Sequence, residues 1–351
     1  MNIVHVVGTG TIGEPLIGLL ADNREHFGIG EVTFHKRTPL LTEKAKVGDL
    51  EQRGAVLTVD DDRKSNFEEL GHAPKFETQE AIERATVVID CTPVGNEMKD
   101  QFYSKASGPI GFMAQGSEFG FGKMYARGIN DAALVEGEEK FLQIVSCNTH
   151  NIAALVKSIG LDKDGTSHLT DGRFLCIRRA NDISQDTGFV ASPTVEAHKD
   201  PQFGTHHARD AHALFETIGY DLNLYSSALK LNTQYMHSVH FSLTLDREID
   251  VDEVMERLME NTRIAVTHKK SANEVFSFGR DHGYYGRLMS HTVVSVETLA
   301  VRNGNEVVGF SFTPQDGNPL LSTVAAMLWH LDSSTMEDRL DVLRRYLFPE
   351  V

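Results

Sequence analysis

The sequence has few cysteines, and this scarcity limits the kinds of site that it can build. The three cysteines are Cys91, Cys147 and Cys176. An odd number of widely separated thiols excludes a disulfide framework, and their spacing is not that of a zinc site. The sequence therefore predicts a reducing, cytoplasmic location and no bound metal.

Excess positive charge and long apolar runs are also lacking. Acidic residues number 50 against 34 lysines and arginines, which gives the chain a formal charge of -16. This charge opposes binding to nucleic acid and to anionic membranes. No run approaches the ~18 apolar residues of a membrane span, and the N-terminus has no basic leader of the signal-peptide kind. We expect neither nucleic acid nor a membrane as a partner.

A glycine-rich turn stands between a predicted strand, residues 2–7, and a predicted helix, residues 15–21. Glycines spaced as G-x-G-x-x-G permit a tight turn and the close approach of a pyrophosphate, which sits at the helix N-terminus. The alternative is a glycine-rich turn that binds nothing. Because strand, turn and helix occur together, we predict a dinucleotide site that includes Gly8, Gly10, Thr11, Ile12 and Gly13.

The second predicted strand, residues 31–34, is followed by basic residues and no acid. Its end reads His35-Lys36-Arg37. Folds selective for NAD often place a carboxylate here to accept the ribose 2′-OH, whereas basic residues can receive a 2′-phosphate. Lys36 and Arg37 therefore favour NADP, with NAD also possible as the cofactor. The alternative is a solvated surface pair.

Two further apolar strands, residues 85–90 and 110–114, are predicted in the same sheet. The first is an almost continuous apolar run, as in parallel strands that are covered on both faces. Loops at the carboxyl ends of such strands line the ligand crevice. We therefore expect the cofactor to be flanked by Thr92, Pro93, Gly116 and Ser117.

Cys147 follows a short apolar strand and precedes an apolar run, Ile152–Ile159, that is expected to be helical. The dipole and the free N–H groups at a helix N-terminus would lower the pKa of the thiol and favour the thiolate. The position suits a nucleophile. A small buried apolar residue, the usual state of a free cysteine, is the alternative.

The second half of the chain is rich in predicted strands. Their β-branched and aromatic residues lie at residues 173–179, 236–245, 289–299 and 307–312. Asn303-Gly304 favours a hairpin turn between the last two strands. Helices are predicted at residues 251–260, 272–280 and 320–331.

These elements predict two folds in one chain. The first is an α/β Rossmann nucleotide-binding domain, and the second is an α+β catalytic domain with a mostly antiparallel sheet. A chain of 351 residues is long enough for both. We place the dinucleotide-binding domain at residues 1–151, the catalytic domain at 152–312, and a C-terminal helical segment that returns to the first domain at 313–351.

Several motifs occur together in an order that resembles one family. They are Gly-Thr-Gly-Thr-Ile-Gly, Asp90-Cys91-Thr92-Pro93, Gln115-Gly116, Ser146-Cys147-Asn148-Thr149, Ile177-Arg178-Arg179-Ala180, His206-His207 and Met236-His237-Ser238-Val239-His240. The chain resembles the archaeal-type (class II) phosphorylating glyceraldehyde-3-phosphate dehydrogenases across nearly its whole length. The resemblance implies a homotetramer that works in glycolysis and gluconeogenesis.

The resemblance also implies a reaction. The cysteine thiolate attacks the aldehyde of glyceraldehyde 3-phosphate, hydride passes to NAD(P), and inorganic phosphate releases the thioester as 1,3-bisphosphoglycerate. Cys147 corresponds to the nucleophile and His237 to the general base. His240 is one residue too distant from His237 for the family's second histidine, and alternation along a strand puts the two on opposite faces.

The remaining roles follow from the same resemblance. The phosphorylated aldehyde and the phosphate are expected to contact Ser146, Asn148, Thr149, Arg178, His206, His207 and Ala208. Arg179 and Gln315 are expected to face the cofactor. Adjacent arginines can offer forked donors to phosphate groups.

Three stretches depart from the family's pattern. His150-Asn151 replaces a small residue and a glycine beside the nucleophile, Glu14 adds a negative charge near the expected pyrophosphate, and Thr313–Asn318 follows the pattern only loosely.

Two other functions stay open: a related acyl-phosphate or semialdehyde reductase, and a catalytically silent nucleotide-binding protein.

Overall fold

A computed structural model describes residues 1–116, 118–182, 185, 188–314 and 316–351. The chain forms two compact units. Unit 1 consists of Met1–Lys123, Val135–Ile144 and Ser322–Val342, and unit 2 consists of Met124–Leu134, Val145–Leu321 and Leu343–Val351. No helix of the described chain has the length and apolar character that crossing a membrane requires.

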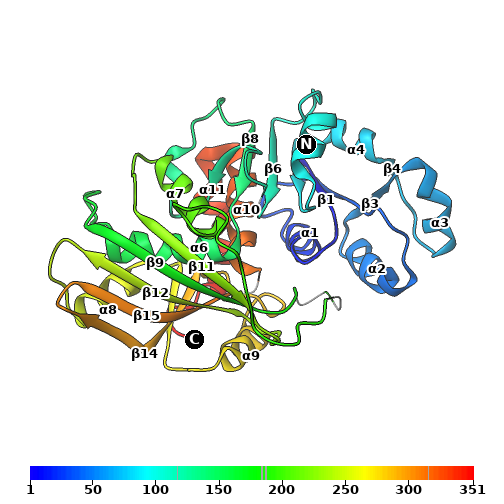
Figure 1. The fold of residues 1–351 in the computed structure, drawn as a ribbon. Helices are drawn as coiled ribbons and strands as arrows, with labels where there is room; N and C mark the ends of the chain where they lie inside the picture. Colours follow the sequence, from blue (N-terminus) through cyan, green and yellow to red (C-terminus); the bar gives the residue numbers. More distant parts are fainter. Residues whose placement is uncertain (117, 183–184, 186–187, 315) are drawn as a thin grey trace. The chain divides into compact units, whose positions relative to one another are not determined.

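The first half of the chain builds an eight-stranded sheet (Figure 1). Its strand order is β4 (Phe76–Glu77), β3 (Val56–Val59), β2 (Glu31–His35), β1 (Ile3–Val7), β5 (Val87–Asp90), β6 (Gly111–Gln115), β8 (Phe141–Ile144) and β7 (Lys123–Tyr125). The strands from β4 to β8 pair in parallel. β5 is buried along its whole length, as its apolar sequence predicts.

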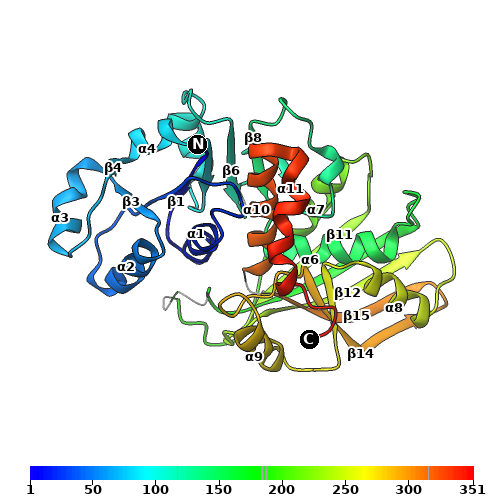
Figure 2. The same cartoon turned by 180° about the vertical axis from the view of Figure 1, so that it is seen from behind.

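Short helices connect these parallel strands. They are α1 (Gly13–Asp22), α2 (Lys44–Gln52), α3 (Lys64–Glu69), α4 (Thr78–Arg84) and α5 (Gly95–Met98), with 3₁₀ turns at Leu41–Glu43 and Asp61–Arg63 and a π turn at Lys99–Tyr103. The predicted C-terminal helix is longer than expected: α10 spans Gly317–Asp332 and is followed by α11 (Met336–Leu340). Figure 2 shows these two helices together.

A second sheet of seven strands follows. Its order is β10 (Thr194–Val195), β11 (Leu224–Lys230), β9 (Leu169–Arg178), β12 (His237–Leu245), β15 (Glu306–Thr313), β14 (Thr292–Arg302) and β13 (Ile264–Thr267). Only β11–β9 and β13–β14 pair in parallel among these strands, and their other four neighbours are antiparallel. A Rossmann-like sheet followed by a mostly antiparallel one confirms the predicted fold class.

The hairpin between β14 and β15 confirms the predicted turn. Asn303 has a φ of 52° and Gly304 a φ of 78°, which is the conformation that an Asn-Gly hairpin turn requires. The helices of this half are α6 (Cys147–Leu155), which continues as a π turn over Val156–Gly160, α7 (His206–Glu216), α8 (Val251–Glu260) and α9 (Ala272–His282).

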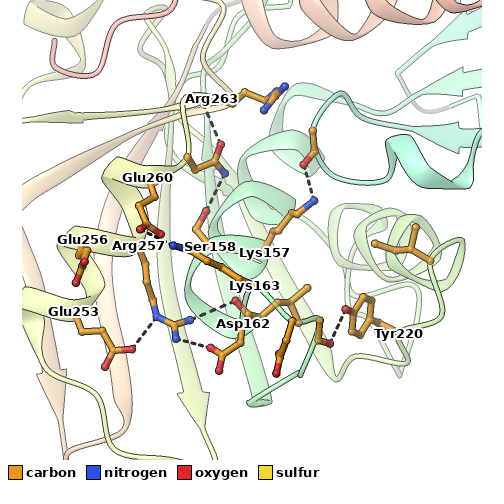
Figure 3. Close-up of a pocket in the computed structure, with 16 residues that line it drawn as sticks. Lys157, Ser158, Asp162, Lys163, Tyr220, Glu253, Glu256, Arg257, Glu260 and Arg263 are labelled. Atoms are coloured by element: carbon orange, nitrogen blue, oxygen red, sulfur yellow. Dashed lines mark hydrogen bonds and ion pairs between the residues drawn. The ribbon is translucent and has the colours of Figure 1, made fainter. Parts of the chain in front are cut away.

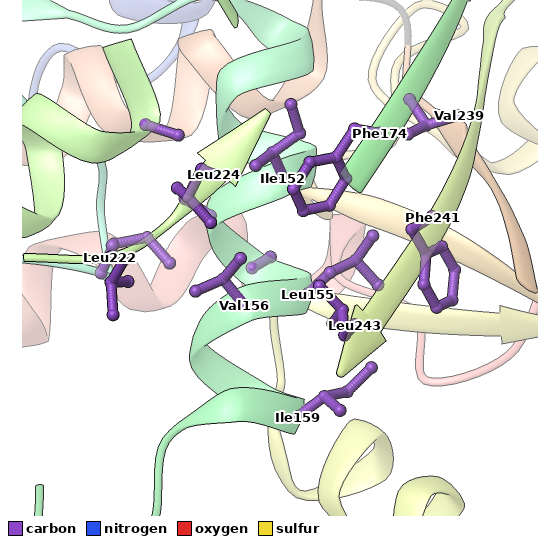
Figure 4. Close-up of a cluster of buried hydrophobic side chains, with 14 of the residues drawn as sticks. Ile152, Leu155, Val156, Ile159, Phe174, Leu222, Leu224, Val239, Phe241 and Leu243 are labelled. Atoms are coloured by element: carbon purple, nitrogen blue, oxygen red, sulfur yellow. The ribbon is translucent and has the colours of Figure 1, made fainter. Parts of the chain in front are cut away.

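Helix α6 is buried against the second sheet. Its apolar side chains include Ile152, Leu155 and Val156, which lie in one cluster with Phe174 and Phe241 from the strands (Figure 4). Burying one such aliphatic side chain contributes roughly 1.5–3 kcal/mol. This packing fixes the helix that begins at Cys147.

Candidate active site

Cys147 is the first residue of α6. Ser146 is the N-cap, and its Oγ accepts a hydrogen bond from the Thr149 backbone N–H at 3.4 Å. The cysteine therefore lies at a helix N-terminus, but this helix begins at Cys147 and not near Ile152. The polar residues between them can be helical because tertiary hydrogen bonds satisfy their buried side chains, which a sequence pattern does not reveal.

The thiol does not have the lowered pKa that its position predicts. Burial raises the pKa of the Cys147 thiol; Arg179 opposes this shift, and the carboxylates of Asp316 and Asp182 add to it. The expectation of a thiolate favoured at neutral pH was therefore wrong for this structure. Desolvation of the sulfur outweighs the nearby positive charge.

His237 begins β12, and only 7% of it is exposed. Its Nδ1 accepts a hydrogen bond from the Arg179 backbone N–H at 3.2 Å, and its Nε2 lies 3.2 Å from Arg179 Nη1. Burial, with help from Arg179 and Arg178, lowers the pKa of His237 well below its usual value. The imidazole is therefore neutral, which is the form that a general base needs.

His240 lies on the other face of β12, as predicted. Residues of this strand alternate between buried and partly buried, with His237 in the buried set and His240 in the other. The His240 ring contacts the Phe310 ring at a centroid distance of 4.9 Å.

The two arginines carry acidic partners that the sequence pattern did not indicate. Arg178 pairs with Glu196. The Arg179 side chain is only 4% exposed, and its Nη2 lies 2.6 Å from Asp182 and 3.9 Å from Asp316. These three acids are far from the arginines in sequence or follow them without a recognisable motif, so no spacing could have identified them.

The histidine pair lies in the first turn of α7. The rings of His206 and His207 are 3.9 Å apart between centroids. His207 is buried and contacts the Asn148 amide, with 3.3 Å between its Nε2 and Asn148 Nδ2. The Ala208 backbone N–H donates to Ser226 Oγ at 3.0 Å. The structure thus brings together Asn148 and His207, while His206 is only half-buried.

The two residues that depart from the family's pattern beside Cys147 are both buried. His150 lies against His291 with 4.8 Å between ring centroids, and its Nδ1 lies 3.0 Å from the Ser146 carbonyl oxygen. Burial lowers the pKa of His150 to about 4. Asn318 Nδ2 donates to the Cys147 carbonyl at 3.0 Å, so a residue of α10 also supports this turn.

The glycine-rich turn has the backbone that its sequence predicts. Gly8 has a φ of 94°, and a Cβ on Gly13 would lie 2.1 Å from the Gly8 carbonyl oxygen. A Cβ on Gly10 would meet no heavy atom within 4 Å. The N-cap of α1, Ile12, makes no side-chain hydrogen bond to the helix. A helix N-terminus without a side-chain cap, preceded by a glycine that faces open space, fits the pyrophosphate of a dinucleotide.

The neighbouring loops also lie where expected. Thr92 follows β5; its backbone N–H and its hydroxyl both donate to Asp90 Oδ1, at 2.8 and 2.6 Å. Its methyl group lies beside Gly8. Pro93 is the next residue, and Gly116, with a φ of 74°, follows β6. The predicted site residues Ser117 and Gln315 lie outside the described residues.

Acids surround the two basic residues after β2. Lys36 Nζ lies 2.5 Å from Glu43. Arg37 is exposed and lines a hollow of about 410 Å³ that Asp60 and Asp62 also line. Glu14 is itself 3.3 Å from Lys46, which offsets the charge that it brings to the start of α1. A 2′-phosphate would have to compete with Glu43 for Lys36.

A larger hollow of about 890 Å³ lies in unit 2 (Figure 3). It contains none of the residues predicted from the sequence. Arg257 pairs there with Asp162 and Glu253, and Lys163 with Glu260. Because these charges are already paired with one another, the size of the hollow does not by itself indicate a ligand.

No family model matches the chain. Curated relatives nevertheless align over most of it. A glyceraldehyde-3-phosphate dehydrogenase of Methanobacterium formicicum is 26% identical over 311 residues, 87% of this chain and 86% of that protein. The protein of the same name from Methanobacterium bryantii is 29% identical, covering 75% and 73% of the two chains. That of Methanobrevibacter smithii is 23% identical, covering 93% of each.

These matches confirm the resemblance drawn from the motifs. Over most of its length the chain is a distant homologue of archaeal proteins named glyceraldehyde-3-phosphate dehydrogenase.

Proposed function

We propose that this protein is a phosphorylating, NAD(P)-dependent glyceraldehyde-3-phosphate dehydrogenase. It oxidises glyceraldehyde 3-phosphate to 1,3-bisphosphoglycerate and also runs in reverse. The observation that carries the proposal is a cysteine at a helix N-terminus whose surroundings include Arg179, with a buried, neutral His237 against the same arginine. The archaeal relatives support a dehydrogenase of their type.

The thiolate of Cys147 adds to the aldehyde carbon and forms a hemithioacetal. His237 takes the proton of the hemithioacetal hydroxyl as the same carbon is oxidised to a thioester. Inorganic phosphate then attacks the thioester, forms the acyl phosphate and returns the thiolate. A bound nicotinamide cofactor would supply the hydride acceptor.

Arg179 links the two catalytic side chains electrostatically. Its positive charge lowers the pKa of the Cys147 thiol and also that of His237. It therefore favours the two forms that the reaction needs, a thiolate and a neutral imidazole. Burial opposes the first of these effects, so thiolate formation is expected to depend on binding of substrate and cofactor.

The negatively charged groups of the substrates are proposed to meet donors from α6, α7 and β9. Arg178 and His206 are half-buried, as is Ser146, and Arg178 would exchange Glu196 for a phosphate group. The residues proposed to line the substrate site, not all of them as donors, are Ser146, Asn148, Thr149, Arg178, His206, His207 and Ala208.

The cofactor is proposed to bind through the glycine-rich turn of unit 1. The N-terminus of α1, which has no side-chain cap, would hold the pyrophosphate. The positions expected to take part are Gly8, Gly10, Thr11, Ile12, Gly13, Lys36, Arg37, Thr92, Pro93, Gly116, Ser117, Arg179 and Gln315. We further propose a cytoplasmic homotetramer that serves glycolysis and gluconeogenesis.

One assay tests this function. Purified protein is mixed with glyceraldehyde 3-phosphate and NAD or NADP, with inorganic phosphate present or omitted. Sustained turnover that requires phosphate is expected. Aspartate semialdehyde and N-acetylglutamate semialdehyde serve as comparison substrates. Turnover with one of these alone would establish the related reductase instead, and no turnover with any of them would contradict the proposal.

A further inference from the structure

Buried polar side chains form a continuous hydrogen-bonded chain that includes Asn148, the residue after Cys147. It consists of Ser311, Asn151, Thr313, Asn148, His207, Thr205 and Ser226, and we call it the polar relay. Its members come from β15, α6, α7, β11 and the residue before α7, and each is at most 6% exposed. Consecutive members lie within hydrogen-bonding distance, so the relay links Asn148 of α6 to β15, α7 and β11.

With the two asparagine amides oriented as in the structure, the first part of the relay runs in one direction. Ser311 Oγ donates to Asn151 Oδ1 at 3.0 Å, and Asn151 Nδ2 donates to Thr313 Oγ1 at 2.8 Å. Because the Thr313 oxygen already accepts this bond, its own proton points to Asn148 Oδ1, 3.0 Å away. The Asn148 carboxamide is thereby held with its Nδ2 toward His207.

The second part sets the tautomer of His207. Asn148 Nδ2 donates to His207 Nε2 at 3.3 Å, so this nitrogen carries the lone pair. The ring proton is then on Nδ1, which donates to Thr205 Oγ1 at 3.1 Å. Thr205 in turn donates to Ser226 Oγ at 2.6 Å. His207 is left with no N–H to offer to an anion, since both its nitrogens face the relay.

The same atoms could bond in the opposite direction, with every hydroxyl and both amides reversed. His207 would then carry its proton on Nε2 and donate to Asn148 Oδ1. The two directions differ in the orientation of the Asn148 carboxamide and in the His207 tautomer. One measurement of that tautomer therefore reports the direction of the whole relay.

We propose that Asn151 and Thr313 are positioning residues for the site around Cys147. They orient the Asn148 carboxamide and hold His207 as its Nδ1–H tautomer. His207 then accepts a hydrogen bond from Asn148 and donates no proton to the substrate. The catalytic consequence rests on the proposed function, whereas the tautomer does not. Without the hydrogen bond from Thr313, the buried Asn148 carboxamide loses one of the two partners that fix its orientation.

Asn151 and Thr313 lie 162 residues apart in the sequence and hydrogen-bond directly to each other. On β15, Thr313 also stands opposite His237 of β12.

The test replaces Thr313 by valine, which keeps the shape of the side chain and removes the hydroxyl, and by serine, which restores it. The tautomer of His207 is read from ¹⁵N NMR of histidine-labelled protein, with the signal assigned by a His207→Gln variant. Thr267→Val is the matched control, because Thr267 is a buried strand threonine whose hydroxyl bonds to Val351 and Lys269, outside the relay.

The parent is expected to show the Nδ1–H tautomer. Thr313→Val should give a mixture of tautomers and lower kcat/KM by about tenfold to a hundredfold, the range expected for a misplaced active-site group. Thr313→Ser should restore both values, and Thr267→Val should change neither.

A parent with the proton on Nε2, or a Thr313→Val variant with unchanged tautomer and kinetics, would overturn the proposal. The parent measurement needs no variant to fold. If the parent has the Nδ1–H tautomer but no dehydrogenase activity with any substrate, the relay stands and the proposed function fails.

Discussion

The first turns of α1 and α6 both follow a parallel strand, yet they are built in opposite ways. At α1 the N-cap is Ile12, no side chain caps the helix, and Gly10 leaves open space. At α6 the N-cap Ser146 bonds to the helix, and the polar residues 148–151 are all buried. The first turn of α1 has no capping side chain, whereas the first turn of α6 is filled with buried side chains.

This difference decides what each turn can do and how easily it is found. A backbone site needs only glycines at fixed positions, so its pattern is local and readable. The site at α6 depends on Arg179, His207, His237 and Thr313, which come from four distant parts of the chain. We expect substitutions around α6 to change catalytic activity. Substitutions in the α1 turn should change cofactor binding or the stability of the backbone there.

The largest effect is expected at the α6 site. Replacing His237 by asparagine keeps a hydrogen-bonding side chain but removes the base. Under the proposed function, kcat should fall roughly a hundredfold to ten thousandfold. The matched control is His240→Asn, since His240 lies on the other face of β12. Equal losses in the two variants would contradict a specific role for His237.

The preference for NADP over NAD tests the proposed cofactor site next to α1. A Lys36→Ala/Arg37→Ala double variant removes the two basic residues after β2. If they bind a 2′-phosphate, a contact of about 1.5–3 kcal/mol is lost, and the ratio of kcat/KM for NADP over NAD should fall roughly tenfold to a hundredfold. Lys44→Ala, at an exposed lysine of α2, should leave the ratio unchanged.

Either of two outcomes would contradict this cofactor assignment. The first is a parent that strongly prefers NAD, and the second is a double variant with an unchanged ratio. In both cases Lys36 would serve only its ion pair with Glu43.

Two glycines of the α1 turn, Gly10 and Gly13, should separate stability from binding. Gly13→Ala places a Cβ 2.1 Å from the Gly8 carbonyl oxygen, so the backbone must shift. The free energy of unfolding should fall by about 1–3 kcal/mol without any cofactor present. Gly10→Ala should barely change stability but should weaken cofactor binding. Chemical denaturation and cofactor titration measure the two effects, and equal stability losses would contradict the assignment.

The smallest effect concerns the acids near Cys147. Since burial and Asp316 both raise the pKa of the Cys147 thiol, the thiolate should be scarce at neutral pH. Below that pKa the rate of alkylation should rise about tenfold for each pH unit. Asp316→Asn removes one raising charge, so it should speed alkylation at pH 7 by several fold. Asparagine also tolerates the left-handed backbone of this position, whose φ is 57°.

A plateau of the alkylation rate already at neutral pH would contradict the raised pKa. An Asp316→Asn variant that reacts more slowly than the parent would contradict the sign of the charge effect. Loss of Asp316 should not alter the rate at Cys91, which burial and Asp90 already keep protonated.

Local patterns predicted much of the fold. The Rossmann-like sheet, the glycine turn, the alternation along β12 and the bounds of α8 all depend on residues close together in sequence. The apolar pattern predicted that helix α6 begins at Ile152, five residues after its observed start at Cys147. Its polar first turn has no apolar periodicity and is helical because buried partners satisfy it.

The candidate site was less predictable than the fold. Its motifs indicated Cys147, His237 and the two arginines, but not the acids that pair with those arginines or the relay through Thr313. The direction of the Cys147 pKa shift was wrong for the same reason. A helix N-terminus is visible in a sequence, whereas the desolvation of one sulfur atom depends on the packing of the whole unit.

The most direct measurement is the mass of the Cys147 peptide after reaction without phosphate. The protein is incubated with glyceraldehyde 3-phosphate and the oxidised cofactor, quenched in acid and digested. We predict one phosphoglyceryl group on Cys147, removed when phosphate is added before the quench and absent in Cys147→Ser. Cys176→Ala, at a buried cysteine of β9, should still be modified at Cys147. Reduced cofactor formed in turnover while Cys147 stays unmodified, or by Cys147→Ser at the parent's rate, would contradict the covalent mechanism.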